Sequence, residues 1–466
     1  MKTMLKLLLF VAVSEIAASS PNILYILGDD QAWTDFGFMG NERVHTPHLD
    51  ALAKKSAVFV NGYVPTSVCR PSLASLLTGL YPHQHGIHFN HGPPGNAGYN
   101  RMKSRQEYKE VREKEFVLIQ KVETLPRLLA KRGYRSLQTG KFWEGHWRNA
   151  GFTEGMTMFK PPPENQHFGG VRRLANGERV AHGNGDFGLQ IGRVTMEPIY
   201  SFIEDCETEE TPWFVWYAPY LPHLPHDAPE KYFKLAESRP NVAPHEVPYF
   251  ASIAQFDDTV GELMKFLEKK KLVENTIIVF ASDNGWSPSR QRRGNEFAQT
   301  KNSKRSPFDL GLRTLILLHW EGHMQPGQYT ELVSTIDLMP TILTATKTES
   351  TTKLPGINLL HFANPPSTLF DNRTLFGEIY PGDATSLGHP ERNIAYRWVR
   401  HRDWKLIVPH SQNPKKAPWG GYLKSRALYN LKDDPFETKN LATSPKHQVK
   451  VESLEKLLDN WWMPPK

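Results

Sequence analysis

The chain has 466 residues, of which 39% are hydrophobic and 23% charged, so it can bury a large core and is too long for one small domain. Its net charge of +7 comes without zinc-ligand spacing, a basic arm or an aromatic ladder, which argues against nucleic acid and favours small anionic ligands. Only two cysteines are present, Cys69 and Cys206, too few for a disulfide framework.

Residues 1–20 have the pattern of a signal peptide. A basic start leads into a short apolar run that ends near Val13, and small residues from Ala17 to Ser20 suit cleavage. The alternative is a buried first helix, but Pro21 and a strand-like run follow at once and leave no linker. We therefore expect a secreted or periplasmic protein. No later stretch reaches the roughly 20 apolar residues of a membrane span.

Apolar, β-branched runs then alternate with helix-like segments along most of the chain. The expected strands include residues 22–27, 214–217 and 276–281, and the expected helices include residues 49–55, 125–132 and 256–272. This alternation is typical of an α/β fold in which a large, mostly parallel sheet is sandwiched by helices. Ligands bind at the carboxyl ends of strands in such sheets, so the strand tips are candidate site positions.

The pattern changes near the C-terminus to shorter strand-like pieces, including Trp404–Val408 and Leu428–Leu431, and a closing amphipathic helix near Val449–Trp462. We expect a catalytic domain at 21–364 and a smaller α+β subdomain, built on an antiparallel sheet, at 365–466. Long stretches near 92–115 and 161–186 have no clear period, and they are either loops over a site or surface excursions.

Two strand tips carry acidic residues. Asp29 and Asp30 follow the first expected strand, and Asp283 and Asn284 follow the strand that ends near residue 281. Each pair alone is most often part of a turn. Together on adjacent strands, three carboxylates and one amide oxygen would repel unless a cation lay between them, and this hard oxygen set suits calcium or magnesium rather than zinc.

Cys69 lies where a helix is expected to begin. Pro71 suits the first helical turn, and Gly79 suits the C-terminal stop. The backbone donors and the dipole at a helix N-terminus favour a nucleophilic anion and a bound anionic substrate. Taken alone, Cys69 is more simply explained as a small buried cysteine.

Several motifs follow one another in order along the chain: Asp29-Asp30-Gln31, Cys69-Arg70-Pro71-Ser72, Thr139-Gly140-Lys141, Pro222-His223-Leu224-Pro225, Ser282-Asp283-Asn284-Gly285, Asp337-Leu338-Met339-Pro340 and Leu428-Tyr429-Asn430-Leu431. Together they resemble the sulfatase family, a branch of the alkaline-phosphatase-like superfamily, over nearly the whole mature chain. The resemblance implies that fold and an arylsulfatase-like activity, in which sulfate is cleaved from an aryl or carbohydrate sulfate ester.

The resemblance also implies a cofactor and a modification. One calcium ion would be held by Asp29, Asp30, Asp283 and Asn284, with the modified Cys69 completing its ligand shell. A formylglycine-generating enzyme would oxidise Cys69 to formylglycine, whose hydrate attacks sulfur, forms a covalent sulfate ester and then expels sulfate. The metal would polarise a sulfate oxygen and lower the pKa of the attacking hydroxyl.

Three more positions match sulfate-binding side chains of the family. Lys141 and Lys304 correspond to two lysines that place positive charge beside the sulfate oxygens, although most lysines are simply surface residues. His223 corresponds to the histidine that contacts sulfate or protonates the leaving oxygen. His226 is the second choice for that role, and an ordinary loop histidine is the alternative for both.

Two positions depart from the family pattern. The family has arginine four residues after the cysteine, whereas this chain has Leu73, which can neither pair with the hydrated aldehyde nor serve recognition by the maturation enzyme. The family's Lys-Trp-His-Leu-Gly is Lys-Phe-Trp-Glu-Gly here, so Trp143 replaces a histidine that helps to activate or anchor the nucleophile. Arg70 and His146 are candidate substitutes, but Arg70 is expected to point elsewhere. The sequence leaves open whether Cys69 is modified.

Three functions therefore remain, in this order. The first is a sulfatase, and the second is a catalytically inert relative that binds sulfated glycan. The third is a phosphoester or phosphonate hydrolase on the same fold, because the metal and the lysines accept either tetrahedral anion. Fold analogy alone does not choose between them.

Overall fold

The computed structural model describes residues 20–161, 171–183, 187–363, 370, 372–380, 383–410 and 421–465. The expected signal peptide, apart from residue 20, and the expected domain boundary at 364/365 lie outside the described residues. Among the residues that are described, no helix has the length and apolar character needed to cross a membrane.

The main sheet has nine strands, and most neighbouring pairs are parallel. Its order is β12-β2-β11-β8-β1-β7-β3-β4, with β13 beside β2, and β11 runs antiparallel to β2 and β8. This confirms the expected α/β sheet. The strands are β1 Asn22–Gly28, β2 Ala57–Tyr63, β3 Arg135–Gly140, β4 Glu154–Gly155, β7 Trp213–Ala218, β8 Thr276–Ser282, β11 Arg313–His319, β12 Gly327–Tyr329 and β13 Val333–Ser334.

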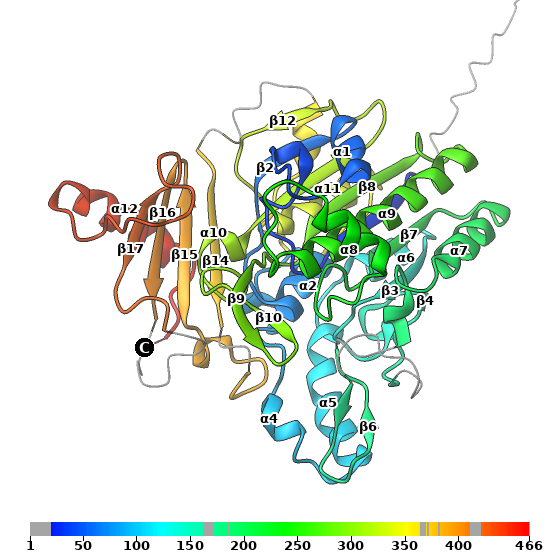
Figure 1. Cartoon of the computed structure of the whole chain (residues 1–466), viewed down its shortest axis with the longest axis horizontal. Helices are drawn as coiled ribbons and strands as arrows, with labels where there is room; N and C mark the ends of the chain where they lie inside the picture. Colours follow the sequence, from blue (N-terminus) through cyan, green and yellow to red (C-terminus); the bar gives the residue numbers. More distant parts are fainter. Residues whose placement is uncertain are drawn as a thin grey trace, which may run out of the picture.

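Helices cover both faces of this sheet (Figure 1). Alternate residues of β1 point to opposite faces: Tyr25 packs in one apolar cluster with residues of α2, α6 and α11, and Leu24 packs in another with residues of α1, α7 and α9. The helices are α1 Pro47–Lys54, α2 Cys69–Thr78, α3 Pro82–His85, α4 Asn96–Tyr99, α5 Arg105–Gln120, α6 Leu125–Ala130, α7 Glu197–Thr208, α8 Glu230–Glu237, α9 Val247–Lys270, α10 Asp309–Leu312 and α11 Leu338–Ala345.

The expected strands and helices are present, but the stretch near 92–115, expected to be loop, contains α4 and the first part of α5, which Ser104 caps by accepting a hydrogen bond from Glu107 N. One helix boundary is also wrong. The helix expected at 256–272 is α9, which begins nine residues earlier, at Val247. Pro248 lies in its first turn, where proline is tolerated. The residues from Tyr249 to Asp257 are buried without interruption, so this part of the helix shows no amphipathic period in the sequence.

The described residues also form two hairpins and several short 3₁₀ helices outside the main sheet. Two hairpins are formed by β5 Arg172–Arg173 with β6 Arg179–Val180, and by β9 Pro288–Arg293 with β10 Glu296–Gln299. Short 3₁₀ helices lie at η1 Gly37–Met39, η2 Trp147–Ala150, η3 Phe187–Gln190, η4 Thr335–Asp337, η5 Leu359–Ala363, η7 Pro390–Arg392 and η9 Pro445–His447.

A second, four-stranded antiparallel sheet is formed near the C-terminus by β14 Thr374–Ile379, β15 Tyr396–His401, β16 Trp404–Pro409 and β17 Ala427–Asn430. Helix α12, Gln448–Trp461, packs on it through Val451, Leu454 and Leu458. Figure 1 shows this sheet, in orange and red, beside the main body. The two parts meet where Glu378 N donates to Pro65 O at 2.9 Å, and a Cβ on Gly377 would lie only 2.2 Å from that oxygen.

Candidate active site

The tips of β1 and β8 bring the acidic residues together. The two strands pair in register from Asn22 with Thr276 to Gly28 with Ser282, so Asp29 and Asp283 leave the sheet side by side. Asp283 N donates to Gly28 O at 2.9 Å, and Asp30 N donates to the Asp283 side chain at 3.1 Å. All the acidic side chains at these tips are buried.

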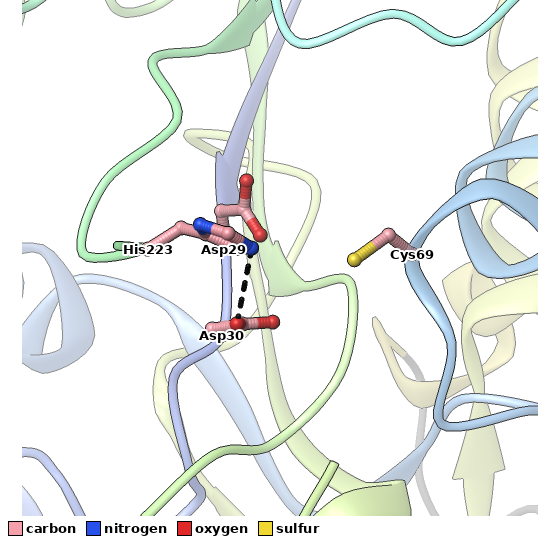
Figure 2. A group of neighbouring side chains, drawn as sticks. All are labelled: Asp29, Asp30, Cys69 and His223. Atoms are coloured by element: carbon pink, nitrogen blue, oxygen red, sulfur yellow. Dashed lines mark ion pairs between the residues drawn. The ribbon is translucent and has the colours of Figure 1, made fainter. Parts of the chain in front are cut away.

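This donor set fits a hard divalent cation. Ligand atoms of Asp29, Asp30, Cys69 and His223 all lie within 4.8 Å of one another (Figure 2). Two further oxygens at the tips, Asp29 Oδ2 and Asn284 Oδ1, are buried and make no hydrogen bond among the described residues. Buried oxygens without partners are costly unless a ligand binds them, so calcium suits the site.

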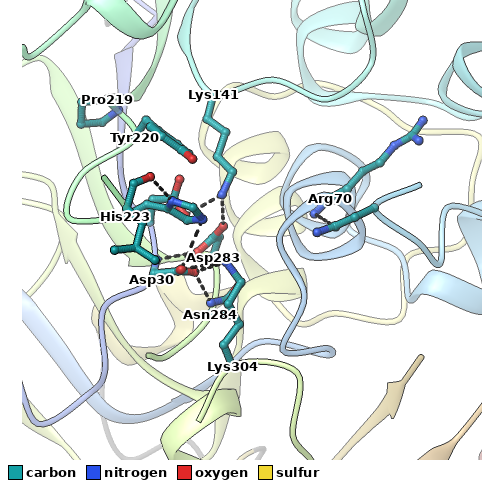
Figure 3. A network of polar contacts seen from close by, with 12 residues as sticks. Asp30, Arg70, Lys141, Pro219, Tyr220, His223, Asp283, Asn284 and Lys304 are labelled. Atoms are coloured by element: carbon teal, nitrogen blue, oxygen red, sulfur yellow. Dashed lines mark hydrogen bonds and ion pairs between the residues drawn. The ribbon is translucent and has the colours of Figure 1, made fainter. Parts of the chain in front are cut away.

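Two buried lysines approach the same carboxylates (Figure 3). Lys141, just after β3, places Nζ 2.5 Å from Asp29 Oδ1 and 3.0 Å from Asp283 Oδ2. Lys304, between β10 and α10, places Nζ 2.6 Å from Asp30 Oδ1. Burial acts to lower the pKa of both lysines, but the adjacent carboxylates outweigh it and raise both pKa values, so both lysines are charged.

The carboxylates respond unequally to this environment. Burial, together with the charge of Asp283, raises the pKa of Asp29 well above its ordinary value. Burial also acts to raise the pKa of Asp30, but Lys304 and its other cationic neighbours hold that pKa below its ordinary value. Three carboxylates face two lysines here, and this excess of negative charge is what a bound cation would neutralise.

Cys69 is the first residue of α2, and Gly79 ends that helix in the left-handed conformation, with φ 65°, as expected from the sequence. Its side chain faces the strand tips across a short gap in Figure 2. Burial raises the pKa of the Cys69 thiol to about 12, so the unmodified side chain is a thiol at neutral pH. A protonated thiol is a poor nucleophile and a poor ligand.

His223 lies beside Asp30, and its Nε2 is 3.4 Å from Asp30 Oδ2. Its Nδ1 lies 2.6 Å from Leu224 O and donates to that carbonyl, which leaves Nε2 facing the site. Tyr220, which was not selected from the sequence, stacks on the His223 ring with the centroids 4.4 Å apart. His226 instead contacts Trp286 and Tyr249, and burial lowers its pKa to about 3.

Neither Arg70 nor His146, the two candidate substitutes, places its side chain in the site to compensate for Leu73 or Trp143. Leu73 is part of the apolar core, and buried Trp143 packs edge-on against His91 and His182. Arg70 turns away from the site (Figure 3). His146 accepts a hydrogen bond from Arg148 N at 3.2 Å and caps η2.

Comparisons with known proteins agree with this arrangement. Residues 21–348 match the family model described as Sulfatase. The chain is 28% identical to human N-acetylgalactosamine-6-sulfatase over 84% of its length and 74% of the relative, and 27% identical to human arylsulfatase A over 93% and 86%. A structure solved with its substrate D-glucosamine-2-N,6-O-disulfate has the same fold, with a TM-score of 0.65 at 16% identity, covering 95% of this chain and 97% of that one.

The family model spans more than half of the chain, and the fold and the order of the motifs agree with it. The chain belongs to the sulfatase family of sulfuric ester hydrolases.

Proposed function

We propose that this protein hydrolyses an aryl or carbohydrate sulfate ester, using one calcium ion and a formylglycine made from Cys69. The observation that carries the proposal is the convergence of Cys69, the strand-tip carboxylates and two buried lysines in one site. The raised pKa of the Cys69 thiol supports modification, because the unmodified thiol is a weak nucleophile.

Each side chain has a role in this proposal. Asp29, Asp30, Asp283 and Asn284 hold the calcium ion together with the modified residue 69, and the bound ion supplies Lewis-acid polarisation of a sulfate oxygen. The charged Nζ atoms of the two lysines lie against the carboxylates at the strand tips, where they stabilise negative charge that builds up on the sulfate oxygens.

His223 handles the leaving group in this mechanism. Its Nδ1–H is fixed by the Leu224 carbonyl, and burial lowers the pKa of His223 well below its ordinary value, so Nε2 carries no proton in the resting site. The negative charge of a bound sulfate ester raises that pKa again, so that Nε2 takes up a proton and gives it to the ester oxygen as the S–O bond breaks. Tyr220 limits rotation of the imidazole by stacking on it.

Export and organisation complete the proposal. Residues 1–20 act as a signal peptide that directs the protein to the periplasm or the cell exterior, and a formylglycine-generating enzyme acts on it during maturation. The catalytic domain is residues 21–364, and the C-terminal subdomain is residues 365–466.

Mass spectrometry of the peptide that contains residue 69, from the native host, tests the modification. The same preparation is assayed on matched 4-methylumbelliferyl sulfate and phosphate. We expect formylglycine at residue 69, faster release from the sulfate, and a loss of at least about 10³-fold in Cys69→Ala. Cys206→Ser is the matched control, because Cys206 is the other buried cysteine and lies in α7.

Other outcomes favour the other candidate functions. Unmodified Cys69 without turnover, combined with affinity for a sulfated glycan, indicates an inert binding protein. Faster release from the phosphate indicates a phosphoester hydrolase on the same fold.

A further inference from the structure

Arg70, the residue after Cys69, is completely buried and makes three short ionic hydrogen bonds. Its Nε and Nη2 donate to the two carboxylate oxygens of Glu144 at 2.8 and 2.7 Å, and its Nη1 donates to Glu115 at 2.6 Å. The two-point contact with Glu144 fixes both the distance and the relative orientation of the two side chains.

This ion pair joins two catalytic segments. Arg70 directly follows the nucleophile position, and Glu144 lies three residues after Lys141. The start of α2 is fixed on its other side as well, because Arg70 N donates to Asn90 Oδ1 at 3.0 Å. A shift of the Lys141 segment relative to Cys69 would therefore break the two-point contact between Arg70 and Glu144.

The pair also joins both places where the chain departs from the family pattern. Glu144 occupies the leucine position of the motif in which Trp143 replaces histidine, and Arg70 lies in the motif in which Leu73 replaces arginine. Neither Leu73 nor Trp143 offers a charged group to residue 69. The neighbouring Arg112, 3.6 Å from Glu115, makes this a buried group of two cations and two anions with no excess charge.

We propose that Arg70 and Glu144 are positioning residues that hold the start of α2 against the Lys141 segment and so fix the position of residue 69 relative to Lys141. Arg70 itself does not touch the reacting atoms, because its side chain points away from the strand tips (Figure 3) and is held by Glu144 and Glu115. For its kinetic readout the inference rests on the proposed function.

The test compares Arg70→Lys with Arg373→Lys. Lysine keeps the charge but cannot make the two-point contact. Arg373 is the matched control because it also makes a two-point contact with a carboxylate in another part of the chain. Its Nη1 and Nη2 donate to the two oxygens of Asp337 at 2.7 and 2.5 Å. Rates on an aryl sulfate are divided by the formylglycine content of each variant, because Arg70 adjoins Cys69.

We expect kcat to fall about 10- to 100-fold in Arg70→Lys with little change in KM, because misplacement by about 1 Å can cost that much. Backbone amides of residues 141–145 should exchange hydrogen faster in Arg70→Lys and at the wild-type rate in Arg373→Lys. Arg70→Met/Glu144→Leu removes one charge of each sign and leaves Arg112 with Glu115, so its melting temperature should recover while its kcat stays low.

A kcat of Arg70→Lys within about twofold of the Arg373→Lys value would overturn this positioning role, as would unchanged exchange in residues 141–145. If the wild type hydrolyses no sulfate ester, the proposed function fails separately. The exchange measurement then decides on the positioning role by itself.

Discussion

Two buried charged clusters in this molecule differ in charge balance. The strand-tip cluster, Asp29, Asp30, Asp283, Lys141 and Lys304, has three carboxylates and two cations. The interface cluster, Asp309, Glu437, Arg400 and Lys405, joins the main body to the C-terminal sheet and has two of each sign. Both oxygens of Asp309 have partners, in Tyr63 and Lys405, whereas Asp29 Oδ2 has none among the described residues.

This difference in charge and pairing distinguishes a cluster that stabilises the fold from one that can bind a cation. A cluster in which each acidic side chain has a cationic partner holds two parts of a protein together, and removing one member leaves a buried charge unpaired. A cluster with an unpartnered oxygen and excess negative charge is instead arranged to bind a cation. The same isosteric change, aspartate to asparagine, should therefore have opposite consequences in the two clusters.

The largest effect is expected from Asp29→Asn. We expect a loss of activity of about 10³-fold and the disappearance of the rise in melting temperature that calcium gives the wild type. Without calcium, the free energy of unfolding should stay within about 1 kcal/mol of the wild-type value, because the change removes a charge that repels Asp283. Calorimetry with calcium and with a chelator measures the calcium-dependent rise in melting temperature and the stability of the metal-free protein. A large loss of stability in the chelator would contradict the proposed difference between the two clusters.

Asp309→Asn should instead reduce the free energy of unfolding by about 3 to 5 kcal/mol, because Lys405 and Arg400 then face only Glu437. The calcium-dependent rise in melting temperature should persist, since Asp309 contributes no ligand at the strand tips. Urea unfolding with and without calcium checks this prediction, and loss of the calcium response would show that the clusters are not independent.

The smallest effect concerns pH. Burial raises the pKa of Glu437 from its ordinary 4.5 to about 7. The folded state therefore holds this proton more tightly than the unfolded state, and the stabilisation is complete below about pH 4.5 and lost as the pH rises to about 7. Over that window the loss should be roughly 2 to 3 kcal/mol.

Glu437→Gln isolates this contribution. The difference in unfolding free energy between wild type and variant should change across that window, because other buried acids titrate equally in both proteins. The lowered pKa of Asp309 has the opposite sign but acts below its ordinary value of 3.8, outside the window. Parallel stability profiles for the two proteins would show that Glu437 does not titrate there.

Much of the fold was predictable because the pattern was strong. The apolar runs of β1, β7 and β8 predicted where these strands lie in the sequence. The strand order, with β1 between β7 and β8, was not predictable, because all three strands are equally buried. The start of α9 was missed because its first turns are buried on all sides. Signals based on periodicity fail where a helix has no exposed face.

The candidate site was only partly predictable. The acidic residues and Cys69 stood out by residue type and by position at strand and helix ends, and the structure brings them together. The partners of Arg70 were not predictable, because they lie 45 and 74 residues away along the chain. Tyr220 was missed for a different reason: it lies only three residues before His223, but the path of the turn, which the sequence does not reveal, places its ring on the imidazole.

The contact of β14 with the segment before Cys69 restricts how this protein can be recombined with its relatives. Gly377 leaves room for the Pro65 carbonyl, and Lys405 reaches Asp309, five residues after Lys304. A chimera that takes its last hundred or so residues from another sulfatase would need a matching residue at each contact. We therefore expect substrate range to be exchanged more readily by grafting surface loops than by swapping the C-terminal sheet.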